Sequence, residues 1–265
     1  MEADLSTTAT LDRTFNVAAA TERFYVRMAM IFVAVAFVGF APTYWVPMAR
    51  GTLTVKPIAH LHALFFYGWL LLFLTQSSLA ASGRLVRHRE MGVLGVAVAT
   101  GMCFVGLAMA ADSIRTMDAA GFGDAARRFA IVPITAVALF AVMFTVAVLN
   151  VGRPEVHKRL LLAATASLLQ AGIGRWFLLF LAPARPAGMI GPSSPPPVAV
   201  SVLPGLLVDL LIVAAMVHDR RTTGRVQRTY WIAGAAVVAV QVLRVPVSAT
   251  GAWMHVPQWL LAIVP

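Results

Sequence analysis

The sequence predicts an all-α, polytopic membrane protein: a bundle of seven transmembrane helices with the N-terminus in the cytoplasm and the C-terminus outside. Three observations predict it. Of the 265 residues, 60% are hydrophobic and only 12% are charged, against about 45–50% and about 25% in soluble domains. The apolar residues form runs of about 20, the length with which an α-helix crosses the hydrocarbon core. Basic residues are distributed unequally between alternate connecting segments, which sets orientation.

The apolar runs define seven expected spans. Helices are expected because a membrane offers no water to the edge of an open sheet, and the runs are too uniformly apolar for barrel strands. Prolines 42 and 47 interrupt the first run and Pro246 interrupts the last. The spans are 25–48, 57–80, 91–111, 129–150, 158–182, 199–218 and 229–250.

These runs divide the chain into three parts. Residues 1–24 are a polar cytoplasmic N-terminal segment and residues 25–250 are the transmembrane domain. Residues 183–198 are rich in proline and are expected to form an irregular outer connector. The tail, 251–265, carries Trp253 and Trp259 and is expected to lie at the outer interface, where tryptophan is enriched.

The basic residues orient the bundle. Thirteen of the 21 lie on the segments that share a side with the N-terminus and six on the opposite side, while Arg175 and Arg244 fall within spans. The positive-inside rule places the first set in the cytoplasm, which predicts a bacterial inner-membrane protein. The net charge of +10 therefore reports orientation and contact with the lipid bilayer, and no nucleic-acid partner is expected.

A short motif occurs twice. Residues 83–89 read GRLVRHR and residues 152–158 read GRPEVHK, so both match G-R-x-x-x-H-[R/K]. Each copy follows one apolar run and opens the next. This pattern predicts that the second and third helices, and the fourth and fifth, form two related hairpins.

The first candidate site is on the second expected helix. His60 and His62 form an H-x-H pair, a candidate metal site, although a regular helix directs the two rings about 200° apart. His62, Trp69 and Gln76 are seven residues apart and so share one face, which is expected to line the bundle interior or a cavity. For His62 three roles are open: a hydrogen-bonding residue between helices, a ligand to metal or haem, and a proton-transfer group.

The second candidate site consists of ionisable residues inside the spans. Arg175, Asp209 and Arg244 each cost about 2.5–3.5 kcal/mol at membrane depth, so each needs a partner or a function. With His62 they could form one polar pocket in the outer half, beside Gln170 and Gln241. The alternatives are an arginine–Asp209 pair that fixes helix packing, an Arg244 side chain that reaches the outer surface, and an anion or haem-propionate site.

The third candidate site is the pair His88 and His157 at the cytoplasmic ends of the two related hairpins. One interpretation is a basic collar that faces lipid headgroups. The other is axial ligation of haem b between facing helices. Cofactor candidates are therefore His62, His88, His157, Arg175 and Arg244, and pocket candidates are Trp69, Gln76, Asp209 and Gln241.

These elements, from His60-x-His62 through His88-Arg89-Glu90-Met91-Gly92 to Asp209 and Gln241-x-x-Arg244, resemble a family of uncharacterised bacterial multi-pass membrane proteins. The histidines at helix edges are also loosely similar to those of b-type cytochrome bundles. The first resemblance implies no activity, and the second implies haem b as the cofactor.

Three function classes stay open from the sequence. They are a haem-binding or redox-linked membrane protein, a small-molecule or anion carrier or sensor, and an accessory subunit of a larger membrane complex. A quinone is a candidate partner of the first. Motifs for zinc proteases, phosphate-binding loops, CxxC redox sites and serine hydrolases are absent from the sequence.

Overall fold

The computed structural model describes residues 22–181 and 194–264, and within these ranges every regular element is helical. Seven helical spans are long and apolar enough to cross a membrane, which confirms the multi-pass helical architecture. The spans are Glu22–Ala49, Pro57–Ala81, Leu85–Ala119, Gly123–Leu149, Pro154–Phe180, Val198–Thr223 and Arg228–Val247. The expected polar segment 1–24 and connector 183–198 lie largely outside the described residues.

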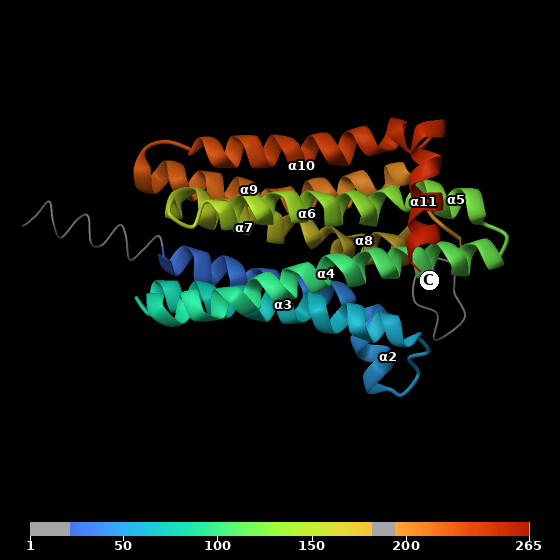
Figure 1. Ribbon diagram of the computed structural model, residues 1–265, viewed down its shortest axis with the longest axis horizontal. Coiled ribbons are helices and arrows are strands. Elements are labelled where there is room, and N and C mark those ends of the chain that lie inside the picture. The colour runs from blue at the N-terminus through green and yellow to red at the C-terminus, as the bar shows by residue number, and fades with distance from the viewer. Residues whose placement is uncertain (1–21, 182–193, 265) are drawn as a thin grey trace, which may run out of the picture.

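The spans stand side by side as antiparallel hairpins (Figure 1). Helices α3 (Pro57–Ala81) and α4 (Leu85–Ala119) form one edge of the bundle, and α9 (Val202–Thr223) and α10 (Arg228–Val247) form the opposite edge. Between them lie α6 (Ile131–Leu149), α7 (Pro154–Leu168) and α8 (Gln170–Leu181). We call the end of the bundle that contains Glu22 and the turns 82–84, 150–153 and 224–227 the Glu22 end.

The opposite end, which we call the α11 end, is closed by a short helix. Helix α11 (Gly251–Ile263) lies across the ends of the spans and packs against α4 and α5 (Gly123–Phe129) (Figure 1). Its Trp253 is buried and donates from Nε1 to the Arg127 carbonyl at 2.9 Å, whereas Trp259 is 74% exposed. One tryptophan anchors the helix to the bundle and the other faces outward, as an interfacial helix requires.

Two spans depart from regular α-helix where proline or glycine occurs. In the first, the π-helical turn η1 (Ala41–Trp45) precedes α2 (Val46–Ala49), and Val46 N–H bonds to the Ala41 carbonyl. Pro42 and Pro47 lack the N–H that a regular helix needs. In the fifth, α7 ends at Leu168 and α8 begins at Gln170, just before Gly172 and Gly174. The expected single helix 158–182 is therefore broken.

The helices pack on a core of large apolar and small side chains. Phe32, Phe140 and Met102 are at most 1% exposed, and the alanines of α7 are fully buried. The backbones of the first span and α8 approach closely, because a Cβ on Gly39 would lie 2.6 Å from Gly172 Cα. Small residues of this kind are what allow membrane helices to approach closely.

Candidate functional site

The two copies of the G-R-x-x-x-H motif lie at the Glu22 end, and their histidines make similar contacts. In each, the histidine N–H bonds at 3.0 Å to the carbonyl of the arginine four residues earlier, His88 to Arg84 and His157 to Arg153. Each ring then contacts the preceding helix through Nδ1, His88 to the Gln76 carbonyl at 3.3 Å and His157 to the Ala147 carbonyl at 2.8 Å. Both hairpins, α3–α4 and α6–α7, thus hold the motif histidine against their first helix, and the relation between them stays a prediction.

These contacts determine which ring nitrogen is free. A carbonyl only accepts hydrogen bonds, so Nδ1 of both histidines carries a proton, and in the neutral form of each ring the lone pair is then on Nε2. A histidine that ligates a metal usually donates its other ring N–H to such an acceptor, which fixes the tautomer and the ring orientation. The Nδ1 contacts of His88 and His157 are of this kind.

The fold brings the two rings together from α4 and α7. Their centroids are 6.5 Å apart and their planes are inclined at 82°. A histidine nitrogen lies about 2.0–2.1 Å from a bound metal, so two nitrogens on opposite sides of one ion are about 4 Å apart. Rings at this separation are within the range that one central atom can join.

Gln76 adds a second sign that a group is bound there. Its backbone carbonyl holds His88, while its side-chain oxygen and nitrogen are both buried with no hydrogen-bond partner among the described residues. A buried unpaired amide costs about 1–3 kcal/mol. The sequence placed Gln76 in an outer pocket; the structure places it beside the histidine pair.

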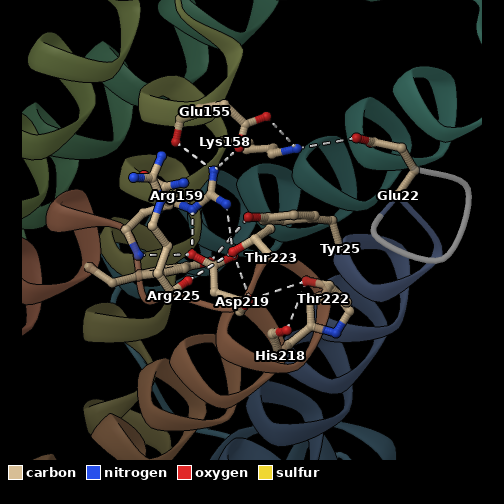
Figure 2. A network of polar contacts seen from close by, with 12 residues as sticks. Glu22, Tyr25, Glu155, Lys158, Arg159, His218, Asp219, Thr222, Thr223 and Arg225 are labelled. Carbon is tan, nitrogen blue, oxygen red and sulfur yellow. Dashed lines mark hydrogen bonds and ion pairs between the residues drawn. The ribbon is translucent and has the colours of Figure 1, made fainter. Parts of the chain in front are cut away.

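A buried ion pair lies at the same end of the bundle (Figure 2). Arg159 on α7 donates from Nε and Nη2 to the two carboxylate oxygens of Asp219 on α9, at 2.9 and 2.7 Å. Both side chains are at most 2% exposed. Arg159 also bonds Glu155, and Asp219 accepts from the Gln227 N–H at 3.3 Å in the turn before α10. The pair therefore joins α7, α9 and the α9–α10 turn.

The pair extends toward the first span (Figure 2). Lys158 contacts Glu155 at 3.1 Å and Glu22 at 3.4 Å, and its ammonium lies 5.2 Å from the centre of the Tyr25 ring. The hydroxyl of Tyr25 bonds that of Tyr230 at 3.2 Å. This charged network thus ties four spans together at the Glu22 end.

Sequence reasoning missed this network by counting Arg159 only as one of thirteen orienting charges. Two signals could have revealed it. Asp219 is the one acidic residue in the basic run His218–Arg221, and Arg159 lies three and seven positions before Leu162 and Ala166 on one helix face. An arginine on the apolar face of a span needs an acidic partner.

A second buried polar cluster joins α8, η2 (Val198–Ser201), α9 and α10 toward the α11 end. Arg244 donates to Gln170 Oε1 at 3.2 Å and to the Ser201 carbonyl at 2.8 Å, and Gln241 donates to Asp209 Oδ1 at 3.2 Å. These four side chains were all named from the sequence, whereas Ser201, which accepts through its backbone carbonyl, was not. Among the described residues neither Arg244 nor Arg175 forms an ion pair with Asp209, so the expected arginine–Asp209 pair is not formed.

Arg175 lies in different surroundings from Arg244. Its guanidinium is stacked 4.1 Å from the centre of the Phe40 ring in the first span, and it donates to the carbonyl of Ala171 on its own helix. His62 stacks on Phe66 with centroids 4.1 Å apart, and its buried Nδ1 has no partner among the described residues. Among the described residues, Arg175 and His62 thus form no hydrogen bond or ion pair with Asp209, Gln241 or Arg244.

The remaining candidates contact neighbouring helices. His60 is exposed and bonds the Tyr44 hydroxyl through Nδ1 at 2.8 Å. Trp69 is buried, donates to the Thr165 hydroxyl of α7 at 3.2 Å and meets Phe140 edge-on. Over residues 22–181 and 194–264, no group of three or more histidine, cysteine or acidic side chains could hold a metal ion.

The structure therefore brings together His88, His157 and Gln76 at the Glu22 end and Gln170, Asp209, Gln241 and Arg244 nearer the α11 end. Arg244 is 16 residues along α10 from Arg228, which corresponds to about 24 Å. It is too distant to hold the propionates of a haem at His88 and His157.

No protein-family model, curated protein or solved structure matches the chain.

Proposed function

We propose that this protein is a membrane haem protein in which His88 and His157 are the axial ligands of haem b. The observation that carries the proposal is the pairing of these two rings, 6.5 Å apart, each held through Nδ1 by a carbonyl of the preceding helix. Two histidines on facing helices are a ligand set that haem iron accepts inside a bundle.

The surrounding residues fit such a group. Arg84 and Arg153 each precede a ligand by four residues and are exposed at the rim, where a propionate could reach them. The unpaired Gln76 amide lies beside His88 and offers both a donor and an acceptor. Both histidines are only half-buried, so one edge of the site opens toward the Glu22 end.

A bound haem b supplies one-electron transfer, with a potential set by its ligands and surroundings. This chain's own contribution is orientation. The Gln76 and Ala147 carbonyls fix the tautomer of each ring, and the Arg159–Asp219 pair begins two residues beyond His157 and holds the start of α7 against α9. Through these contacts the ligand separation is set by the packing of helices and not by a loop.

The test is an absorption spectrum of protein purified in mild detergent from cells supplied with haem precursor. We expect a Soret band, and an α-band after reduction with dithionite. His88→Ala and His157→Ala should each remove these bands, whereas His255→Ala, an exposed histidine on α11, should keep them. Colourless wild-type protein, or bands retained in both variants, would refute the proposal.

We further propose that the Glu22 end faces the cytoplasm of a bacterial cell and that the protein lies in the inner membrane. This proposal is supported by the thirteen basic residues of the segments on that side against six on the other.

A further inference from the structure

Helix α4 presents an unpartnered heptad seam on the outside of the bundle. Positions 86, 90, 93, 97, 100 and 104 are separated alternately by four and three residues, and all six side chains are exposed. This spacing is that of a left-handed helix pair. We call these residues the α4 seam: Val86, Glu90, Val93, Ala97, Thr100 and Phe104. The seam covers 19 residues, about 27 Å of helix from first to last, on the opposite helix face from His88.

In the hairpin α6–α7, the helix face that corresponds to the α4 seam is covered by other helices. Gly83 and Gly152 are 69 positions apart, so seam positions 90, 93, 97 and 100 correspond to Arg159, Leu162, Ala166 and Leu169. Those four residues are only 0–4% exposed, because α7 packs there against α9 and α10. The α3–α4 hairpin forms an edge of the bundle (Figure 1), and no helix of the described part of the chain covers its seam, whose side chains are exposed.

The charges on the seam distinguish it from an ordinary lipid-facing surface. Arg159 is neutralised by Asp219, whereas Glu90, at the equivalent position, has no ion-pair partner among the described residues. The other acidic residues described at the Glu22 end, Glu22, Glu155 and Asp219, are all paired. The exposed Glu90 carboxylate, next to the first residue of the apolar run, is available to pair with a cation on another chain.

The missing cation is present on a second copy of the same helix. Arg89 and Glu90 are adjacent and exposed; Glu90 belongs to the seam and Arg89 lies beside it. When two parallel helices pack through one seam about a two-fold axis, each seam side chain inserts among four residues of its partner, which include the residue just before its own equivalent position. Glu90 of each copy would therefore meet Arg89 of the other, giving two equivalent ion pairs.

We infer that the protein is a parallel homodimer formed through the α4 seam. Small Ala97 allows close approach, the Thr100 hydroxyl supplies a hydrogen-bonding group at membrane depth, and the Arg89–Glu90 pairs fix the register. The inference uses the hairpin relation and the seam alone and is independent of whether haem is bound.

Charge reversal tests the register. Glu90→Arg and Arg89→Glu each place like charges across the interface and should weaken dimerisation roughly fivefold, measured by mass photometry over a dilution series in detergent. The double swap Arg89→Glu with Glu90→Arg restores both pairs and should return the wild-type dimer. Wild-type protein that is monomeric at every concentration, or a double swap as weak as the single variants, would overturn the inference.

Cross-linking in native membranes tests the face. The only cysteine, Cys103, is first replaced by Ser. Thr100→Cys should then form a disulfide-linked dimer on oxidation, whereas Leu243→Cys should not. Leu243 is 57% exposed and lies 15 residues into α10, as Thr100 lies 15 residues into α4. Equal cross-linking at both positions, or a Thr100→Cys adduct only with a different protein, would contradict the homodimer.

Discussion

At the scale of single residues, Arg159 shows how this fold tolerates a charge that is removed from water. Its guanidinium is 1% exposed and makes a bidentate contact with Asp219, so the two charges satisfy each other's hydrogen-bonding groups. Such a buried pair stabilises little relative to apolar residues of the same size. Removal of one partner is costly because it leaves the other charge buried and unpaired.

Arg159→Gln should therefore lower the free energy of unfolding by about 3–5 kcal/mol, seen as a large fall in Tm in detergent, and Asp219→Asn should have a similar effect. Arg220→Gln, an exposed arginine one residue after Asp219, is the control and should change Tm little. If Arg159→Gln behaved like that control, the ion pair would not hold α7 and α9 together.

The same scale shows what the sequence could and could not locate. The types of functional residue were visible, because histidine, arginine and aspartate are rare in spans. Their partners were not, since pairing depends on how the helices are rotated against one another. His62, Arg175, Asp209 and Arg244 share a similar expected depth, yet Arg175 contacts Phe40 of the first span and Arg244 contacts Gln170 and Ser201. Depth follows from counting residues along a helix, whereas the direction of a side chain does not.

At the scale of elements, the number of spans was predictable and their ends were not. Seven apolar runs correspond to the seven spans. Helix α4, however, covers Leu85–Ala119 where the sequence predicted 91–111. Polar residues at both ends of α4 continue the helix beyond the apolar run. Hydropathy therefore identifies the apolar part of the helix and underestimates its full length.

The crossing of the first span over α8 depends on one pair of glycines. A methyl group at Gly39 would meet Gly172 Cα at 2.6 Å, where only backbone could yield. Gly39→Ala should therefore separate the two helices and destabilise the protein by about 1–3 kcal/mol, measured as a lower Tm. Gly68→Ala in α3, where an added Cβ meets nothing within 4 Å, should leave Tm unchanged or slightly raised. Equal effects at the two positions would show that the close approach is not important for stability.

At the scale of the whole molecule, charge and chemistry coincide at one end. The Glu22 end carries the histidine pair, the charged network and most of the exposed arginines, whereas the α11 end carries fewer basic residues and is covered by α11. Nearly all of the basic residues are arginines. Lys56 and Lys158 are the only two lysines in the chain, and both form ion pairs. The free basic groups are therefore arginines, which bind phosphate and carboxylate groups through paired N–H donors.

That asymmetry leads to a prediction for the intact cell. Transfer of the arginine-rich turns across the membrane is disfavoured, so the Glu22 end should be cytoplasmic. In a Cys103→Ser background, Thr52→Cys at the α11 end should react with a membrane-impermeant maleimide in intact spheroplasts. Val151→Cys, which is 65% exposed in the turn before α7 at the Glu22 end, should react only after the membrane is permeabilised. The reverse pattern would invert the topology and place the His88–His157 site on the outer face of the membrane.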